Sequence, residues 1–341
     1  MATKRIGKQT IRLQNSPSIL ATATVVGPKE GQGPLGEQFD LVEKDMLLGE
    51  KSWERAEQKM LSTACQMALS RAGLTPEQVD LMFAGDLLNQ TITANFTARD
   101  LAIPFLGLYG ACSTMAESLA LGSLMIDGGF ADHCLVGTSS HYASSERQFR
   151  MPVEYGGQRK PWAQWTVTGS GAAVVGPSGG SPQHVTHVTT GRIMDLGVKD
   201  PNDMGSAMAP AAADTLLHHF QETERDPSYY DLIVTGDLGL LGSELCRKLT
   251  HQSGVDLGSN YDDCGVMIFS PEQDTHSGGS GCGCSASVVY GPIWRRLHAR
   301  ELNKLLIVGT GALLSTISFQ QGESIPCIAH AVAIENMIPS E

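Results

Sequence analysis

The sequence predicts an α/β protein built from two related halves. One observation is a long repeat: residues 105–140 and 281–310 each lead from a Cys-Ser pair through a helical pattern into an apolar strand. A second observation is a shorter repeat upstream, in which VDLMFAGDLL (79–88) matches YDLIVTGDLG (230–239). Two copies of one α/β unit are the simplest account of both repeats.

The spacing inside the long repeat is the same in both copies. As many residues separate Cys112 from Gly137 as separate Cys284 from Gly309. Strands that alternate with helices and carry long apolar runs are typical of parallel sheets covered by helices on both faces. We therefore expect a parallel sheet in each half.

The first half begins with a β-rich run over residues 18–26, which ends at a Gly-Pro pair. A helix is predicted after the cap residue Ser52, because apolar residues then recur at spacings of three and four until Gly73. A capping box at Thr75 leads into the first repeated strand. A glycine-rich strand over residues 169–175 completes this half.

The second half repeats this order. A Gly/Ser/Pro segment, residues 176–183, marks the boundary and divides the chain into halves 1–180 and 181–341. The elements expected after it are a helix that begins near Met204 with Pro210 in its first turns, the Asp231 strand, the Cys284 helix, the Leu305 strand and a last strand over residues 327–334.

Composition excludes several classes of function. The formal net charge of −12 argues against binding to nucleic acid and against simple adsorption to anionic lipid, since both require a basic surface. The sequence shows neither a signal peptide nor an apolar run long enough to span a membrane, so we expect synthesis and folding in a cytosol. Most of the eight cysteines stand in apolar stretches, which indicates buried free thiols and no disulfide framework.

Cys112 is the main candidate for chemistry. It stands where an apolar strand meets a helix N-terminus, and there free N–H groups and the helix dipole stabilise a thiolate or a bound anion. A lone cysteine at such a place can instead be a small buried residue at a close contact between helix and strand. The repeat favours the first interpretation, because helices related by a two-fold axis would aim the N-termini near Cys112 and Cys284 into one cleft.

Other candidates have weaker support. The pair Cys282 and Cys284 has no second pair with ligand spacing, so we expect no metal site. Arg147 and Arg150, in the long insertion over residues 141–160, could bind carboxylates or could be solvated loop charges. Three histidines are candidate bases, although each, taken singly, is more often a surface or satisfied core histidine: His251, His276 and His330.

With these motifs in place, the chain resembles the thiolase and ketoacyl synthase superfamily. The turn GACS at 110–113 is similar to that family's nucleophile turn, the strand at 169–175 to its Gly-x-Gly-Ala strand, and the segment from Met204 to its Met-Gly motif. Cys327 falls where thiolases carry a second cysteine. The resemblance implies a five-layer αβαβα fold with two pseudo-two-fold related halves, and a homodimer.

The resemblance breaks at the partners of the nucleophile. The family's second-half His or Asn should fall near Gly236 and Asp237, and its other partner position is occupied by Cys282. The triple glycine after Cys327 is replaced by Ala-His-Ala, which includes His330. Loss of one oxyanion donor typically costs about 100- to 1000-fold in rate, so we expect no catalytic residues and a vestigial nucleophile position.

Several long stretches resemble, more closely, a sporulation family of endospore formers within this superfamily. They are GDLLNQTITAN, FLGLYGACSTMAESLALGSLMIDGGFA, SSHYASSERQFR, PVEYGGQ, DMGSAMAPAAADT and ESIPCIAHAV. This resemblance implies binding of dipicolinic acid (pyridine-2,6-dicarboxylic acid), possibly with Ca²⁺, and its transport into the developing spore and release at germination. It also implies membrane partners from the same operon and a peripheral place at the spore inner membrane.

The expected ligand site is the former thiolase cleft. Two helix N-termini could supply backbone donors to both carboxylates of a small planar dianion without lysines. Asp86 and Asp237, which end the two repeated strands beside the cleft, should repel a dianion unless they are protonated, turned away or bridged by Ca²⁺. The residues expected to bind the ligand are Cys112, Ser113, Asp86, Gly236, Asp237, Cys282, Cys284 and His330.

Three functions compete at this point. The first is a noncatalytic protein that binds dipicolinate, without cofactors. The second is an active thiolase or ketoacyl synthase that uses Cys112 with an unrecognised base such as His330. The third is a structural subunit whose cleft is vestigial.

Overall fold

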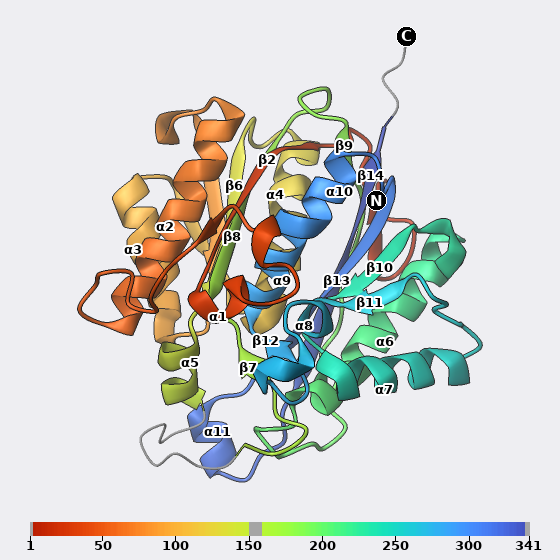
Figure 1. Ribbon diagram of the computed structural model, residues 1–341. Coiled ribbons are helices and arrows are strands. Elements are labelled where there is room, and N and C mark those ends of the chain that lie inside the picture. Colours follow the sequence, from red (N-terminus) through yellow and green to blue (C-terminus); the bar gives the residue numbers. More distant parts are fainter. Residues whose placement is uncertain (1–2, 150–158, 338–341) are drawn as a thin grey trace.

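The chain folds into five layers. A computed structural model describes residues 3–149 and 159–337. Figure 1 shows two helices, labelled α4 (Thr114–Gly128) and α9 (Cys282–Val288), between the sheet strands of the two halves. Further helices cover the outer face of each sheet region. This is the predicted five-layer αβαβα arrangement.

The first half supplies the strands on one side of the central helices, and in spatial order they are β5, β4, β6, β8 and β2. Its remaining helices are outer α2 and α3, short α1 and α5. The bounds are β2 Ser18–Val26, α1 Pro28–Gly31, α2 Trp53–Ala72, β4 Leu81–Gly85, α3 Ile92–Leu101, β5 Phe105–Gly107, β6 Cys134–Ser140, α5 Tyr142–Phe149 and β8 Gly169–Gly176.

The second half has the matching spatial order β11, β10, β13, β14 and β9. Helices α6 and α7 cover its outer face. The bounds are β9 Gln183–Thr189, α6 Met204–Thr223, β10 Leu232–Thr235, α7 Gly239–Gln252, β11 Tyr261–Asp263, α8 Cys264–Met267, α10 Trp294–His298, β13 Lys304–Ala312, α11 Thr316–Gln320 and β14 Cys327–Asn336.

The two halves have the same topology. In each, one strand pairs in parallel with two others, as β4 does with β5 and β6, and as β10 does with β11 and β13. The halves join where Ser18 of β2 pairs with His184 of β9, which makes one 12-stranded sheet. The expected boundary at residue 180 falls between β8 and β9, although strand β1 (Thr10–Arg12) pairs with β9 of the second half.

The expectation of purely parallel sheets is wrong. The strands β2 and β8 are antiparallel to each other, β8 is antiparallel to β6, and β14 is antiparallel to both β13 and β9. All residues of β8 and most residues of β14 are buried, so these antiparallel strands have mainly apolar sequences, as buried parallel strands do. Apolar composition therefore indicated burial on two faces, and it did not give the direction of the strands.

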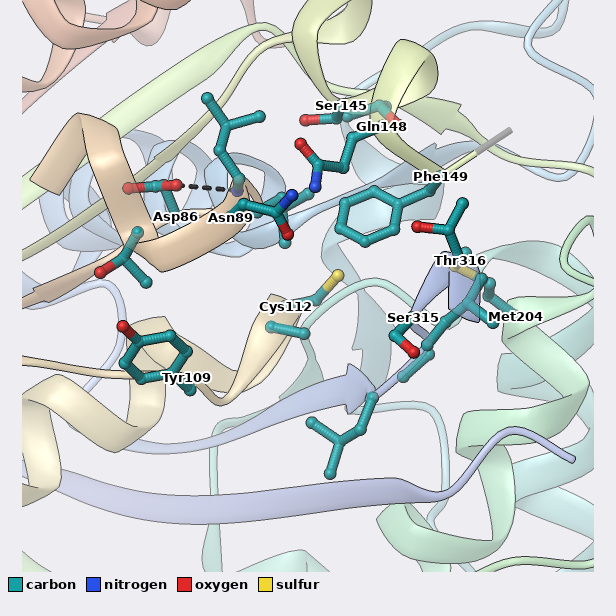
Figure 2. Close-up of a pocket in the computed structure, with 18 of the residues that line it drawn as sticks. Asp86, Asn89, Tyr109, Cys112, Ser145, Gln148, Phe149, Met204, Ser315 and Thr316 are labelled. Atoms are coloured by element: carbon teal, nitrogen blue, oxygen red, sulfur yellow. Dashed lines mark hydrogen bonds between the residues drawn. The ribbon is translucent and has the colours of Figure 1, made fainter. Parts of the chain in front are cut away.

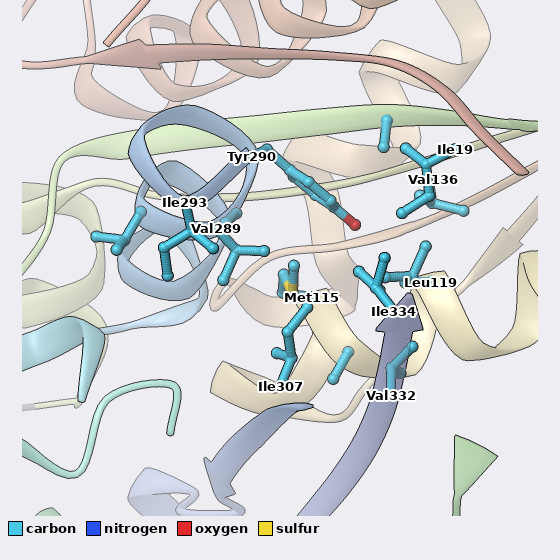
Figure 3. Close-up of a cluster of buried hydrophobic side chains, with 14 of the residues drawn as sticks. Ile19, Met115, Leu119, Val136, Val289, Tyr290, Ile293, Ile307, Val332 and Ile334 are labelled. Carbon is cyan, nitrogen blue, oxygen red and sulfur yellow. The ribbon is translucent and has the colours of Figure 1, made fainter. Parts of the chain in front are cut away.

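The hydrophobic core is divided among the layers. One cluster lies between α2, α3 and the first-half strands, and another lies between α6, α7 and the second-half strands. The third fills the centre, where residues from α4 and the segment after α9 meet the inner faces of both halves; it includes Met115, Leu119, Val289, Ile307 and Ile334 (Figure 3). Burial on this scale explains why α4 is apolar around most of its circumference.

Local signals in the sequence set the ends of the outer helix α2. The Ser52 hydroxyl accepts a hydrogen bond from the Arg55 N–H at the start of the helix. Gly73 ends it with φ of 68°, a left-handed conformation that glycine adopts without a steric penalty. The predicted capping box at Thr75 and Gln78 is also present, immediately before β4.

Small elements complete the chain near the site. Strand β3 (Leu41–Val42) pairs with β2, and strands β7 (Trp165–Thr166) and β12 (Gly279–Ser280) form a separate two-stranded sheet. Gly281 precedes α9 with φ of 99°.

Among the helices of residues 3–149 and 159–337, none combines the length and the apolar character that a membrane span requires.

Candidate functional site

A pocket of about 310 Å³ opens where loops from both halves meet in front of Cys112. Figure 2 shows Cys112 facing Phe149 and Gln148 of α5 on one side and Ser315 on another. The first half contributes the segment 86–91 after β4, Tyr109 to Cys112 before α4, and three residues of α5. The complete lining among the described residues is Asp86, Leu87, Leu88, Asn89, Gln90, Thr91, Tyr109, Ala111, Cys112, Ser145, Gln148, Phe149, Thr166, Met204, Ser280, Ala312, Leu313, Leu314, Ser315 and Thr316.

Cys112 lies in a short 3-10 turn, Ala111–Ser113, at the start of α4. Ala111 is in the left-handed region with φ of 50°, and the Ser113 hydroxyl donates its proton to the Gly110 carbonyl at 2.7 Å, so it has no proton left to donate to a ligand. Cys112 itself is only 5 % exposed, and its small exposed area faces the pocket. The sequence prediction of a cysteine at a helix N-terminus therefore holds, although the thiol is almost enclosed.

The carboxyl group of Asp237 is the charged neighbour of the Cys112 thiol, and each group acts on the pKa of the other. Burial and then the nearby Asp237 charge raise the pKa of Cys112 well above its usual value. A thiolate here would have a carboxylate as its neighbour, whereas an activated cysteine requires a positive or hydrogen-bond-donating one. The site therefore stabilises the thiol and disfavours the nucleophile.

Asp237 is fully buried and is held by donors on both oxygens. The Gly281 N–H donates to Oδ2 at 2.8 Å, and the Thr310 hydroxyl donates to Oδ1 at 2.8 Å. The Ser280 hydroxyl donates to Oδ2 at 3.3 Å. Burial raises the pKa of Asp237, and these donors oppose that rise. Gly281, the N-cap residue of α9, thus donates its N–H to an internal carboxylate. This N–H is therefore not free to bind a ligand.

Asp86 is the counterpart of Asp237 in the first half and lies on the pocket wall. Its two oxygens accept hydrogen bonds from the N–H groups of Leu88 and Ala94, both at 2.8 Å. Figure 2 shows one of these bonds as a dashed line at Asp86. Burial raises the pKa of Asp86 to about 6, and the backbone donors lower it. Of the three possibilities for these aspartates, the geometry agrees best with a carboxylate turned into its own loop.

A second acidic group lies behind the pocket wall. Glu57 of α2 is fully buried and accepts hydrogen bonds from the Ser139 hydroxyl at 3.1 Å and the Ser144 hydroxyl at 2.7 Å. Burial and then the Asp86 charge raise the pKa of Glu57 to about 8. The Cys282 thiol donates to the Ser139 carbonyl at 2.9 Å, so Cys282 occupies the space between this region and Asp237.

Ser145 is the lining residue whose hydrogen bonding is incomplete. Its side chain is 1 % exposed, and its hydroxyl has no hydrogen-bond partner within the described part of the chain. A buried hydroxyl without a partner costs about 1–3 kcal/mol, so such a group in a pocket wall indicates a water molecule or a ligand. The insertion that the sequence analysis singled out thus reaches the pocket through α5, by Ser145, Gln148 and Phe149.

The structure corrects the expected lining at six positions. Ser113, Gly236 and Asp237 lie behind the wall, and the Cys284 thiol lies against Gly279, where a Cβ would come within 3.2 Å of its sulfur. Cys282 points to Ser139, and His330 of β14 accepts a hydrogen bond from the Gly191 N–H at 3.2 Å. The central helices α4 and α9 begin near the same place, but the N–H groups of Gly281 and Gly283 at the start of α9 donate to Asp237 and Ser140 of the protein itself. A part in ligand binding for these six residues stays a prediction.

The other polar candidates lie away from the pocket. His251 is in the last turn of α7 and exposed, and His276 contacts the Lys160 carbonyl at 2.6 Å. Arg147 forms an ion pair with Glu54 on the surface of α2. Arg150 lies outside the described residues. None of the three described side chains lines the pocket in residues 3–149 and 159–337.

Sequence reasoning missed part of the second-half wall, which consists of Ala312 to Thr316 after β13. This segment follows the repeated strand by a few residues, at the carboxyl end where α/β proteins bind ligands, and that position was the available signal. The lining contains no Lys or Arg among the described residues. An anion would therefore be held by hydroxyl, amide and backbone donors.

Comparison with known proteins now decides the family. The model of the family described as Stage V sporulation protein AD matches residues 7–335. The Stage V sporulation protein AD of Bacillus subtilis (strain 168) is 49 % identical over 332 residues, which cover 97 % of this chain and 98 % of that one. The chain belongs to the Stage V sporulation protein AD family. It is thus a sporulation protein with a thiolase-like fold.

Solved structures outside the Stage V sporulation protein AD family share its fold. The chain is similar to 3-oxoacyl-[acyl-carrier-protein] synthase III of Aquifex aeolicus, with a TM-score of 0.57, 12 % identity, and coverage of 94 % of this chain and 100 % of that one. It is also similar to cerulenin-bound OleA of Xanthomonas campestris, with a TM-score of 0.62, 14 % identity, and coverage of 95 % and 98 %. At these identities the likeness establishes the fold and nothing about activity.

Proposed function

We propose that this chain binds dipicolinic acid, or its calcium chelate, in the Cys112 pocket without catalysing a reaction on it. The protein would take part in moving dipicolinate into the developing spore and in releasing it at germination. The observation that carries the noncatalytic half of the proposal is the burial of the Cys112 thiol beside the carboxyl group of Asp237. Family membership and the resemblance described above supply the ligand.

The chemistry of the site opposes acyl transfer. A thioester exchange needs a thiolate, and a base or oxyanion donor within reach of the reacting carbonyl. At Cys112 the neighbouring group is a carboxylate, which raises the pKa of the thiol. The candidate base His330 has its Nδ1 occupied by the Gly191 N–H, and burial lowers the pKa of His330 to about 4. The pocket thus keeps the position of a nucleophile without the means to activate it.

The lining suits a small planar anion. Phe149 and Tyr109 offer aromatic surfaces for a pyridine ring. Hydroxyl and amide groups from Ser145, Gln148 and Ser315 offer uncharged donors for carboxylates, and Ser145 has its hydroxyl unused among the described residues. The carboxyl group of Asp86 has both oxygens occupied by backbone N–H groups, which reduces its repulsion of an anion.

Calcium would enter with the ligand. The two carboxylates and ring nitrogen of dipicolinate converge on one point, so the ligand itself supplies the oxygen-rich coordination that Ca²⁺ prefers. Residues 3–149 and 159–337 contain no group of three His, Cys, Asp or Glu side chains placed to hold a metal ion. The protein would therefore recognise the chelate through its outer atoms and would contribute no Ca²⁺ site of its own.

We also propose that the protein lies at the periphery of the spore inner membrane, beside membrane proteins of the same operon. The family resemblance supports this location and these partners. A homodimer through the β5 edge is expected on the same ground, and Leu106 in β5 and Tyr109 after it are 52 % and 62 % exposed. Light scattering of the purified protein measures the oligomeric state, and co-purification with each operon product tests the partners.

Calorimetric titration with dipicolinate, with and without Ca²⁺, tests the central part. We expect saturable binding that is lost in Cys112→Trp, which fills the pocket, and weakened in Gln148→Ala. The matched control Gln252→Ala removes the same side chain from the exposed end of α7 and should bind normally. Acetyl- and malonyl-CoA should give neither heat nor acylation of Cys112. Thioester binding without dipicolinate binding would overturn the proposal in favour of an acyltransferase.

A further inference from the structure

The wall of the Cys112 pocket carries negative charge that a dianion must meet. Asp86 lines the pocket, and Glu57 lies directly behind it with no solvent contact. The two carboxyl groups come from different elements, the loop after β4 and helix α2, and the Asp86 charge acts on Glu57 through the buried space between them. Two like charges in such a space strongly favour retention of a proton by one of them.

We propose that binding of an anion in this pocket is coupled to proton uptake by the buried pair Glu57 and Asp86. The inference rests on the proposed function and adds to it that the pocket binds a proton together with its anionic ligand. A carboxylate oxygen of the pair takes a proton from solvent as the dianion enters, and this proton offsets part of the incoming negative charge. No bond to the ligand forms or breaks.

The contacts of the pair give this coupling a path. Ser144 donates to Glu57, and the next residue along α5, Ser145, lines the pocket with a buried hydroxyl that lacks a partner among the described residues. That unused hydroxyl is an independent indication that a ligand atom belongs at this wall. An anionic group bonded to Ser145 would approach the pair from the side of Asp86.

The surroundings of the pair supply no cation in the described part of the chain. Cys282 of α9 is the next titratable group, and beyond it lies Asp237, so the neighbours are neutral or acidic. Other charged or titratable side chains on the elements that contact α2 have partners of their own: Glu146 with Thr166, Arg147 with Glu54, His141 with Met46 and Arg99 with Asp100.

The state of the pair before binding follows from its burial. Burial raises the pKa of Glu57 to about 8 and the pKa of Asp86 to about 6, so at pH 7 Glu57 holds a proton and Asp86 is mostly ionised. A dianion beside Asp86 raises the pKa of Asp86 further, because the charged form then has two more negative charges nearby. We therefore expect uptake of roughly one proton for each dipicolinate bound near pH 7.

The affinity for free dipicolinate should fall as the pH rises. Below pH 6 both groups are already protonated, so uptake falls towards zero and affinity is highest. Above pH 8 both must gain a proton, and the affinity should fall by up to about tenfold per pH unit for each proton taken up. The calcium chelate is neutral, so its binding should take up fewer protons than free dipicolinate and should depend less on pH.

Calorimetry of the full-length protein with sodium dipicolinate, in phosphate and in Tris at pH 7, measures the protons taken up from the difference in heat. The expected result is uptake in the wild type, little uptake with the calcium chelate and its loss in Asp86→Asn. Asp100→Asn removes an exposed carboxylate from α3 and should behave as the wild type. Binding with equal heats in both buffers would overturn this inference alone, whereas absence of binding in either buffer would overturn the proposed function as well.

Asp86→Asn also disturbs the hydrogen bonds that Asp86 accepts from two backbone N–H groups. A second variant, Glu57→Gln, therefore tests the pair without changing those bonds. In Glu57→Gln the side chain stays neutral at every pH, so dipicolinate should bind more tightly than to the wild type at pH 9 and equally at pH 6. A structural defect would weaken binding at both pH values. If the ratio of the Glu57→Gln affinity to the wild-type affinity were the same at pH 6 and at pH 9, proton uptake by the pair would be contradicted.

Discussion

The thiol of Cys112 lies beside the carboxyl group of Asp237, across the boundary between the two halves of the fold, and the Asp237 charge opposes its ionisation. Asp237 ends the same Gly-Asp motif that Asp86 ends in the first half. The two aspartates have diverged in use, because Asp86 accepts hydrogen bonds from backbone N–H groups at Leu88 and Ala94, while Asp237 accepts one from Gly281 at the start of α9 and lies beside the thiol. The Asp237 charge raises the pKa of Cys112, and we propose that this keeps the thiol unreactive.

Reactivity of the thiol tests this arrangement. Asp237→Asn removes the carboxylate that opposes ionisation, so the pKa of Cys112 should fall and alkylation by iodoacetamide at pH 8 should become faster. In the wild type, Cys112 should react more slowly than a free cysteine in solution. Mass spectrometry of the Cys112 peptide over a pH series gives both rates, and fast wild-type labelling near neutral pH would contradict the assigned partner.

Ser145 and Ser144 offer a matched pair of adjacent hydroxyls. Ser145→Ala removes a hydroxyl without a partner among the described residues, so stability should be unchanged or slightly higher, while dipicolinate affinity should fall by about 0.5–1.5 kcal/mol, or roughly 2- to 10-fold.

Ser144→Ala removes a donor to buried Glu57 and should lower the free energy of unfolding by about 1–3 kcal/mol. Urea unfolding and calorimetry separate the two effects. An equal loss of stability in both variants would show that Ser145 has an internal role.

Gly309 of β13 tests the contact between the halves. A Cβ at this position would lie 2.6 Å from the Ala116 Cβ and 3.2 Å from the Ser113 carbonyl, in the turn and helix that carry Cys112. Gly309→Ala should therefore lower the free energy of unfolding by about 1–3 kcal/mol and also weaken ligand binding.

Gly128→Ala is the control, because a Cβ there meets only the exposed ring of Phe130, and urea unfolding should give less than about 0.5 kcal/mol of change. A neutral Gly309→Ala would mean that α4 can move away from β13.

His219 gives a pH-dependent contribution to stability. It is fully buried between Thr189 and Tyr230, and burial, then nearby His187, lowers the pKa of His219 to about 3. The unfolded chain gains a proton below about pH 6.5, and the folded chain does not, so this contribution is complete above pH 6.5 and declines as the pH falls.

Buried carboxyls such as Glu57 act in the opposite direction, so the comparison is between wild type and His219→Gln. Between pH 7.5 and pH 5.5 the wild type should lose about 1 kcal/mol more unfolding free energy than the variant. Parallel losses in urea titrations would contradict a neutral His219.

Much of the architecture could be predicted because its signals are local or repeated. The cap Ser52 and Gly73 define α2, and the shared spacing around Cys112 and Cys284 identified the two halves. Strand direction was beyond the reach of these signals: β8 and β14 have the same apolar composition as parallel strands, and only their pairing separates them.

The site was predicted less completely, because its walls come together over long distances in the sequence. The position of Cys112 was clear from its motif, whereas its contact with Asp237 depends on how two loops from different halves meet. Ser145 could be assigned only to an insertion that is functional in general, since no pattern shows which face of α5 points inward. Cys282 and His330 occupy family positions, yet the start of α9 and strand β14 turn them away from the pocket.

A crystal structure of the protein soaked with dipicolinate tests the central claim most directly. The account predicts electron density for a planar ligand between Cys112 and Phe149, with a carboxylate oxygen within hydrogen-bond distance of Ser145, and no covalent bond to the Cys112 sulfur. Density elsewhere, for example in the surface hollow lined by Arg159, Lys160 and His276, with the Cys112 pocket unchanged, would contradict it.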